Sequence, residues 1–155
     1  MAIISPPPLY SDVAVDGRRV NIDWLRWFNS IVQGFSLSSS LAGSVTLAAQ
    51  AASVASAPVA QSLAPGVYRV SYYARVTTAA TSSSSLAIDV GWTDGVIACA
   101  LSVAAVTGNT TATVSAGSLI VKVDNGTDIT YATTYASTGA TSMQYALSLR
   151  VEALP

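Results

Sequence analysis

Hydrophobic and polar positions repeat with two different periods along this chain, and the period changes near residue 36. Between about residues 21 and 34 the apolar side chains recur every three or four positions, which is the period of an amphipathic helix. From residue 66 onward they recur at every second position in several segments, which is the period of a half-buried strand. The pattern predicts one short helix near the start and a β-rich body after it.

The predicted helix begins near Asn21 or Asp23, either of which can cap it, and ends at Gly34. Its apolar side chains cover most of one side and are Trp24, Leu25, Trp27, Phe28, Ile31, Val32 and Phe35. A helix of three or four turns is only marginally stable by itself, so these apolar side chains must pack against another part of the chain or another protein. One alternative is the chain's own β-body. We favour the other, in which the helix packs against further copies of the chain or inserts into a partner assembly.

The residues before the helix resemble a docking arm in composition. Three consecutive prolines, Pro6, Pro7 and Pro8, predict an extended polyproline segment, and Asp16-Gly17 predicts a turn. The candidate anchoring residues are these prolines, Leu9, Tyr10, Arg18, Arg19 and the seven apolar helix residues.

Residues 36–64 are rich in Ala, Ser and Val, and we interpret them as a connector with one edge strand. Pro58 and Pro65 exclude a central strand here, because proline cannot donate to the ladder. Alternation within 44–50 is typical of a strand.

Residues 65–155 alternate strand patterns with turn signals, which predicts an antiparallel β-sandwich or jelly roll. Turns are expected at Asp94-Gly95 and, as a hairpin, at Asn125-Gly126. The nearly continuous apolar run 96–106 predicts a central strand buried on both faces, with Cys99 as a small buried hydrophobe. The last strand is expected to be central and to lie beside the start of the domain. The predicted organisation is an anchoring arm (1–35), a connector (36–64) and a jelly-roll domain (65–155).

Composition narrows the function classes. Charged residues make up 10% of the 155 residues, against about 25% in typical soluble proteins. Such a surface would favour association, so we expect copies of the chain or a larger assembly to cover much of it. No apolar run approaches the ~20 residues that cross a bilayer, and the few cations argue against a nucleic-acid partner. The first residues lack a signal-peptide pattern, so we expect synthesis in the cytoplasm.

Candidate chemistry is sparse. The chain has no histidine and one lysine, which excludes the usual nucleophile–base pairs; we expect no enzyme activity and no cofactor. The acids of the body are scattered, at Asp89, Asp94, Asp124, Asp128 and Glu152. The segment 124–128 offers oxygen ligands suited to calcium, but a tight turn is the simpler interpretation.

Aromatic and arginine side chains are the remaining candidates for a binding surface. Most of the aromatics are expected in the core or at a subunit interface, with a ligand site as the alternative; they are Tyr68, Tyr72, Tyr73, Trp92, Tyr131, Tyr135 and Tyr145. Arg69 and Arg75 are expected to pair with Asp89 or with a neighbouring subunit.

Two stretches resemble virion proteins of tailed bacteriophages and prophages. The first is PPPLYSDVAVDGRRVNIDWLRWF, with its proline-rich start and W-x-x-W-F helix. The second is GVYRVSYYARVTTAATSSSSLAIDVGWTDG with the Thr-, Ser- and Gly-rich segments that follow it. This body is similar to the jelly-roll domains of phage head fibres, decoration proteins and tail-fibre tips. Such domains resemble the trimeric tumour-necrosis-factor and C1q-type heads in topology.

The resemblance implies a homotrimer in the virion, assembled in the host cytoplasm, whose arms attach to the major capsid protein or to another virion protein. The function expected from it is capsid decoration, cement or a short head fibre. The alternative is a tail-fibre or tail-tip protein that binds a host-surface glycan through loops 77–85, 107–113 and 137–142. A depolymerase is a third and weaker candidate.

Overall fold

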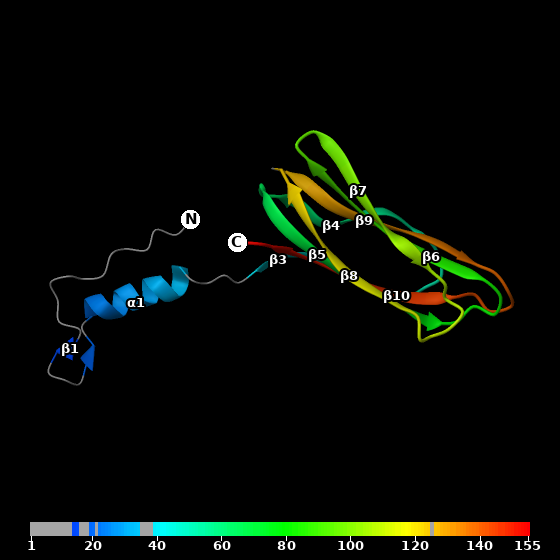
Figure 1. Cartoon of the computed structure of the whole chain (residues 1–155), viewed down its shortest axis with the longest axis horizontal. Helices are drawn as coiled ribbons and strands as arrows, with labels where there is room; N and C mark the ends of the chain where they lie inside the picture. Colours follow the sequence, from blue (N-terminus) through cyan, green and yellow to red (C-terminus); the bar gives the residue numbers. More distant parts are fainter. Residues whose placement is uncertain (1–13, 16–18, 21, 35–38, 125) are drawn as a thin grey trace. The chain divides into compact units, whose positions relative to one another are not determined.

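The structure is a computed structural model, and it describes residues 14–15, 19–20, 22–34, 39–124 and 126–155. It divides into two compact units, one up to Ser38 and one from Ser39 to Pro155. Each unit is described by itself below (Figure 1).

The N-terminal unit contains a small ladder and the helix. Strands β1 (Ala14–Val15) and β2 (Arg19–Val20) pair antiparallel, and α1 spans Ile22–Gly34. The predicted helix is therefore confirmed, with an acidic residue, Asp23, in its first turn, where it complements the helix dipole. The predicted turn at residues 16–17 and the cap at Asn21 lie outside the described residues.

The second unit is an antiparallel β-sandwich of two four-stranded sheets, as predicted (Figure 1). The first sheet has the order β3-β10-β5-β8 and the second has the order β4-β9-β6-β7. The strands are β3 (Ser40–Gln50), β4 (Val54–Leu63), β5 (Gly66–Thr78), β6 (Ser84–Asp94), β7 (Ile97–Val106), β8 (Val114–Val123), β9 (Thr127–Ser137) and β10 (Gln144–Ala153).

The core lies between the sheets and follows the alternation in the sequence. On β5, Tyr68, Val70, Ala74 and Val76 are buried, as the pattern predicts, while the residues between them point outward or are half-buried. On β10, the four residues predicted to share one face are all buried; they are Tyr145, Leu147, Leu149 and Val151. Burial of these alternate side chains is the main force that holds the two sheets together.

Strand β10 is central, with β3 on one side and β5 on the other. Ser40 pairs with Ala153, so the first residue of the sandwich lies beside the last strand. The central position of the last strand is confirmed, and its end also lies beside the predicted start of the domain near residue 65, since Tyr68 pairs with Ala153.

The segment predicted to be a connector contributes two full strands, β3 and β4, and the sandwich starts at Ser40 rather than near residue 65. Both strands lie at sheet edges, where many positions stay exposed and small Ala and Ser side chains are sufficient. Pro58 lies in the edge strand β4, which agrees with its exclusion from central strands.

The prediction that residues 96–106 form a central strand was wrong. They include β7, which is the edge strand of the second sheet and is largely exposed. Strand β6, its neighbour, faces β8 of the first sheet, whereas among the described strands β7 packs mainly on β6. A nearly continuous apolar run therefore does not require burial on both faces.

The two expected turns have different outcomes. Asp94-Gly95 forms the β6–β7 hairpin, since Asp94 pairs with Ile97 and Gly95 has φ +66°. The turn at Gly126 is not a hairpin, because β8 belongs to the first sheet and β9 to the second. Gly126 has φ +76°, and Thr127 donates to the Asp124 carbonyl through N and Oγ1 at 3.3 and 2.7 Å. Asn125 lies outside the described residues.

Candidate interaction surface

The outer surface of the first sheet carries long, positively charged side chains, and we call it the cationic face. In the middle of this sheet outward positions align across the strands: Arg150 pairs with Ser71 on β5 and with Ser44 on β3, and Tyr73 pairs with Ser148. The cations on it are Arg69, Arg75, Lys122 and Arg150, which are all the Lys and Arg residues between 39 and 155.

Glu152 holds two of these arginines. Its carboxylate accepts from Arg69 Nε and lies 3.1 Å from Arg150 Nε. The hydrogen bond from Arg69 lowers the pKa of Glu152, and the charge of Arg150 acts in the same direction. The expected pairing of Arg69 with Asp89 was wrong, because Asp89 lies on the second sheet, where it accepts from Ser102.

Exposed apolar side chains accompany the cations on this face. They are Leu41, Val67, Tyr73, Val114 and Ile120, and Ile120 is 66% exposed. The outer surface of the second sheet is different: it carries mainly Ala, Ser, Thr and Gly with Asp89, and none of the exposed large hydrophobics of the described residues lies on it. Arginine and tyrosine among apolar residues are typical of protein interfaces, so the cationic face is the candidate interaction surface.

A groove of about 300 Å³ crosses this face. Short side chains form its floor, and they are Ser44, Thr46, Ser71 and Ser148. Tyr73, which is 47% exposed, and Arg150 border it. The groove lies where these short side chains adjoin two long ones, because Ser44 and Ser71 flank Arg150 across the strands while Thr46 and Ser148 are in line with Tyr73. Hydroxyls, an aromatic ring and a guanidinium together can bind a polar ligand or a side chain of a partner.

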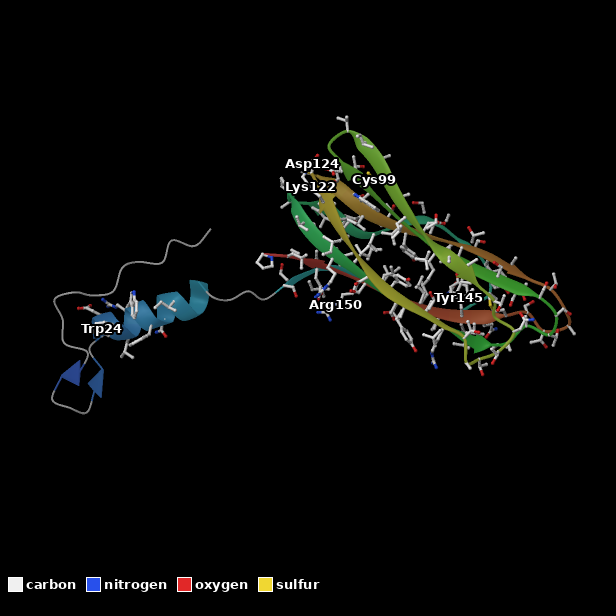
Figure 2. The ribbon with its side chains drawn as sticks, viewed as in Figure 1. Trp24, Cys99, Lys122, Asp124, Tyr145 and Arg150 are labelled. Carbon is white, nitrogen blue, oxygen red and sulfur yellow. The ribbon has the colours of Figure 1, made fainter. Side chains whose placement is uncertain are left out.

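The aromatic residues predicted to anchor the chain cluster on α1. Trp24 and Trp27 make an edge-to-face contact with ring centroids 5.3 Å apart, and Phe28 lies 5.8 and 5.2 Å from them. Such contacts add to the stability of a short helix. Within the described residues Phe28 remains 44% exposed, and Leu25 is also exposed. Figure 2 labels Trp24 on this helix.

The structure describes only part of the predicted anchor. Trp24, Leu25, Trp27, Phe28 and Ile31 are described with their side chains, and Ile31 is half-buried. Arg19 lies in β2 and Val32 in α1, and only their backbone is described. The other predicted anchoring residues, Pro6, Pro7, Pro8, Leu9, Tyr10, Arg18 and Phe35, lie outside the described residues.

Three of the tyrosines are core residues, since Tyr68, Tyr131 and Tyr145 are buried. Tyr145 Oη donates to the Ala52 carbonyl at 2.9 Å and lies 2.8 Å from Thr133 Oγ1. Burial raises the pKa of Tyr145, so its hydroxyl is protonated at neutral pH. Figure 2 places Tyr145 on β10.

The acidic side chains at the end of the sandwich are engaged by neighbours. Lys122 Nζ lies 2.9 Å from Asp94 Oδ1, and this hydrogen bond and the charges of Asp94 and Asp124 raise the pKa of Lys122 (Figure 2). Asp128 Oδ1 accepts from the Ser62 amide at 2.8 Å. In the described part of the chain no three Asp, Glu, Cys or His side chains cluster as metal ligands.

Cys99 was expected in the core, and this was wrong. It lies half-buried on the edge strand β7 (Figure 2), beside a hollow of about 440 Å³ that is also lined by Trp92, Asp128 and Thr130. Because β7 pairs only with β6 among the strands that the structure describes, Cys99 keeps part of its surface in solvent.

No family model matches this chain, and no curated protein matches it at a significant level. None of the described helical residues form a segment long and apolar enough to cross a membrane.

Proposed function

We propose that this chain is a structural component of a bacteriophage virion: a trimeric capsid decoration, cement or short head-fibre protein attached through its N-terminal unit. The observation that carries the proposal is the division of the chain into a unit that contains a short aromatic helix and a sandwich that has its own core. An anchor and a displayed domain are the two parts that such a protein needs.

The helix supports the anchoring role by its composition. Its three aromatic rings contact one another, yet Leu25 and Phe28 stay exposed in the described structure. Aromatic side chains supply large contact areas and dominate interface energetics. Burying Leu25 and Phe28 against a shell protein would give α1 the packing that a helix of 13 residues lacks by itself.

The sandwich supports a role in an assembly. Its cationic face presents apolar and arginine side chains together, on a chain with only 10% charged residues. Contact with copies or with shell proteins would remove this surface from water.

The test is cryo-electron microscopy of particles from the phage or prophage that encodes the chain, compared between wild type and Trp24→Ala/Phe28→Ala. We expect trimeric density on the capsid lattice, and loss of that density in the double variant while the isolated protein keeps its thermal midpoint. Val96→Ala, an exposed apolar truncation in the β6–β7 turn outside the cationic face, is the matched control. Full retention of the double variant on heads would contradict anchoring by the helix, and density only at the tail would contradict the decoration role.

A second candidate function, binding of a host-surface glycan at the tail, is favoured by the groove beside Tyr73 and Arg150. A sugar ring can stack on a tyrosine while hydroxyls and a guanidinium hydrogen-bond to it. A glycan array would test it, with Tyr73→Ala expected to abolish binding and Val114→Ala, on the same face outside the groove, expected to retain it. Equal binding by both variants would contradict a site in this groove.

A further inference from the structure

The four edge strands of the sandwich are not equally protected against pairing with another chain. Edge β4 contains Pro58 and three register shifts, and edge β3 contains two register shifts. Edge β8 carries Lys122 and an interior glycine, Gly117. Proline, bulges, charges and glycine all discourage a further strand from adding to a sheet.

Edge β7 lacks these features between Ile97 and Val103. These seven residues pair with β6 in unbroken register, from Asp94–Ile97 to Ile88–Val103. They include no proline, glycine or charged residue, and the sequence has no charge between Asp94 and Lys122. Ile97 is 66% exposed. A long, regular, uncharged edge is a template for another strand.

The same seven residues, IACALSV, are self-complementary about Ala100. In an antiparallel pairing centred on Ala100, Ile97 would oppose Val103 and Cys99 would oppose Leu101 of the second copy. On the other face Ala98 would oppose Ser102. On one face of the sheet each apolar residue would therefore oppose another apolar residue, and on the other face each small residue would oppose a small one. Matched pairs of this kind stabilise neighbouring strands.

We propose that β7 pairs antiparallel with β7 of a second copy of this chain, centred on Ala100, so that the second sheets of two sandwiches join into one eight-stranded sheet. This contact is isologous, since the same strand is used by both copies. The pairing satisfies the edge's unpaired backbone groups and covers Ile97 and Leu101.

Electrostatics favours a second copy as the occupant. Two identical edges can approach without placing like charges together, because the paired segment is uncharged. Asp89 is the acid nearest the middle of this edge, and it lies one strand away, opposite Ser102. In the proposed register Ser102 faces Ala98 of the second copy, so the two Asp89 side chains are not opposed.

The experiment is to measure the mass of the full chain in solution by light scattering coupled to size-exclusion chromatography. The wild type is expected at an even multiple of 15.8 kDa, and Leu101→Lys is expected to halve that mass. Leu101 is 44% exposed, so the lysine ammonium can reach water, but in a β7–β7 pair it would face the second strand. Thr134→Lys is the matched control and should keep the wild-type mass, because it adds the same charge at an exposed position of the central strand β9, away from both β7 and the cationic face.

Circular dichroism and thermal unfolding establish that the variants fold, and Ile97→Lys provides a second disruption if Leu101→Lys does not. A wild-type mass that is an odd multiple, or one that neither lysine on β7 changes, would overturn the proposal. If the wild type is a trimer and neither lysine variant on β7 changes its mass, the pairing proposed here is rejected while the proposed function is not. The failures of the two proposals are therefore distinguishable.

The register has its own test. Leu101→Cys places a thiol opposite Cys99 of the second copy, and mild oxidation should give a covalent dimer. Val103→Cys places its thiol opposite Ile97 instead, and should not cross-link to Cys99. Efficient cross-linking of the Val103→Cys protein, or none in the Leu101→Cys protein, would overturn the pairing centred on Ala100.

Discussion

Tyr145 closes a chain of hydrogen bonds that ties four segments of the sandwich together. Its hydroxyl proton goes to the Ala52 carbonyl, at 2.9 Å, so the bond between Tyr145 and Thr133 must use the Thr133 proton. Thr133 Oγ1 in turn accepts from the Val54 amide at 2.9 Å. The chain of donors therefore runs from Val54 on β4 through Thr133 on β9 and Tyr145 on β10 to the β3–β4 connection.

Replacing Tyr145 with phenylalanine keeps the ring in the core and removes the central member of this chain. Two hydrogen bonds are lost: the Thr133 hydroxyl keeps the bond from the Val54 amide but its proton loses Tyr145 as acceptor, and the Ala52 carbonyl loses Tyr145 as donor. At about 1 kcal/mol for each net hydrogen bond, we expect the free energy of unfolding to fall by about 2 kcal/mol. For a unit of this size that corresponds to a thermal midpoint lower by about 8 °C.

Chemical denaturation followed by circular dichroism measures this change. Tyr73→Phe is the matched control, because the Tyr73 ring lies on the surface, and it should stay within about 0.5 kcal/mol of the wild type. Thr133→Val breaks the same chain, so the double variant should cost about 1 kcal/mol less than the sum of the single changes. A loss below about 0.5 kcal/mol for Tyr145→Phe, or full additivity with Thr133→Val, would refute the connected chain.

Three further outcomes follow from packing and charge. Gly43→Ala would place a Cβ in steric clash with the Val59 carbonyl oxygen, so the strands must shift and thermal unfolding should show a loss of about 2 kcal/mol; an unchanged midpoint would contradict this close approach. Leu147→Ala removes a fully buried side chain and should cost about 3 kcal/mol by urea denaturation, whereas a loss under 1 kcal/mol would mean that the core collapses into the space. Folding lowers the pKa of Glu152 from its ordinary value, mainly through the hydrogen bond from Arg69, so the pair stabilises the fold above the ordinary carboxyl pKa and this contribution is lost as pH falls through the lowered pKa. Glu152→Gln should flatten the stability profile in that acid range, and an identical acid profile would contradict the pairing.

Alternation predicted the core strands well because one face of each is buried. On β5 and β10 the period of two placed Tyr68, Val70 and Leu147 inside and left Arg69 and Tyr73 outside. The helix could be predicted equally well, since the spacing of its apolar residues and the position of Gly34 mark its extent. Both features follow from the order of residues that are close in sequence.

The position of a strand within its sheet, at the edge or in the centre, could not be predicted from the sequence in the same way. The run around Cys99 reads as a buried strand, yet it is an edge, because the order of strands depends on contacts between distant segments. For the same reason the turn at Gly126 was taken as a hairpin although it joins two sheets.

The candidate surface shows the same division. Alternation placed Arg69, Tyr73 and Arg75 on one face, but only the register of β10 brings Arg150 and Glu152 beside them. The pairing of Arg69 with Glu152 therefore joins residues 83 positions apart, which no local pattern reveals.

The adjacency of Ser40 and Ala153 determines how the sandwich responds to a pulling force. These residues pair at the end of an antiparallel ladder, so a load applied between residues 39 and 155 acts across the β3–β10 hydrogen bonds at that end. Antiparallel ladder bonds run perpendicular to the strands, and under such a load they break one after another, starting at this pair. Tension between these two points would therefore unzip β3 from the first sheet at low force, whereas a load between residue 39 and β7 would have to cross the whole core.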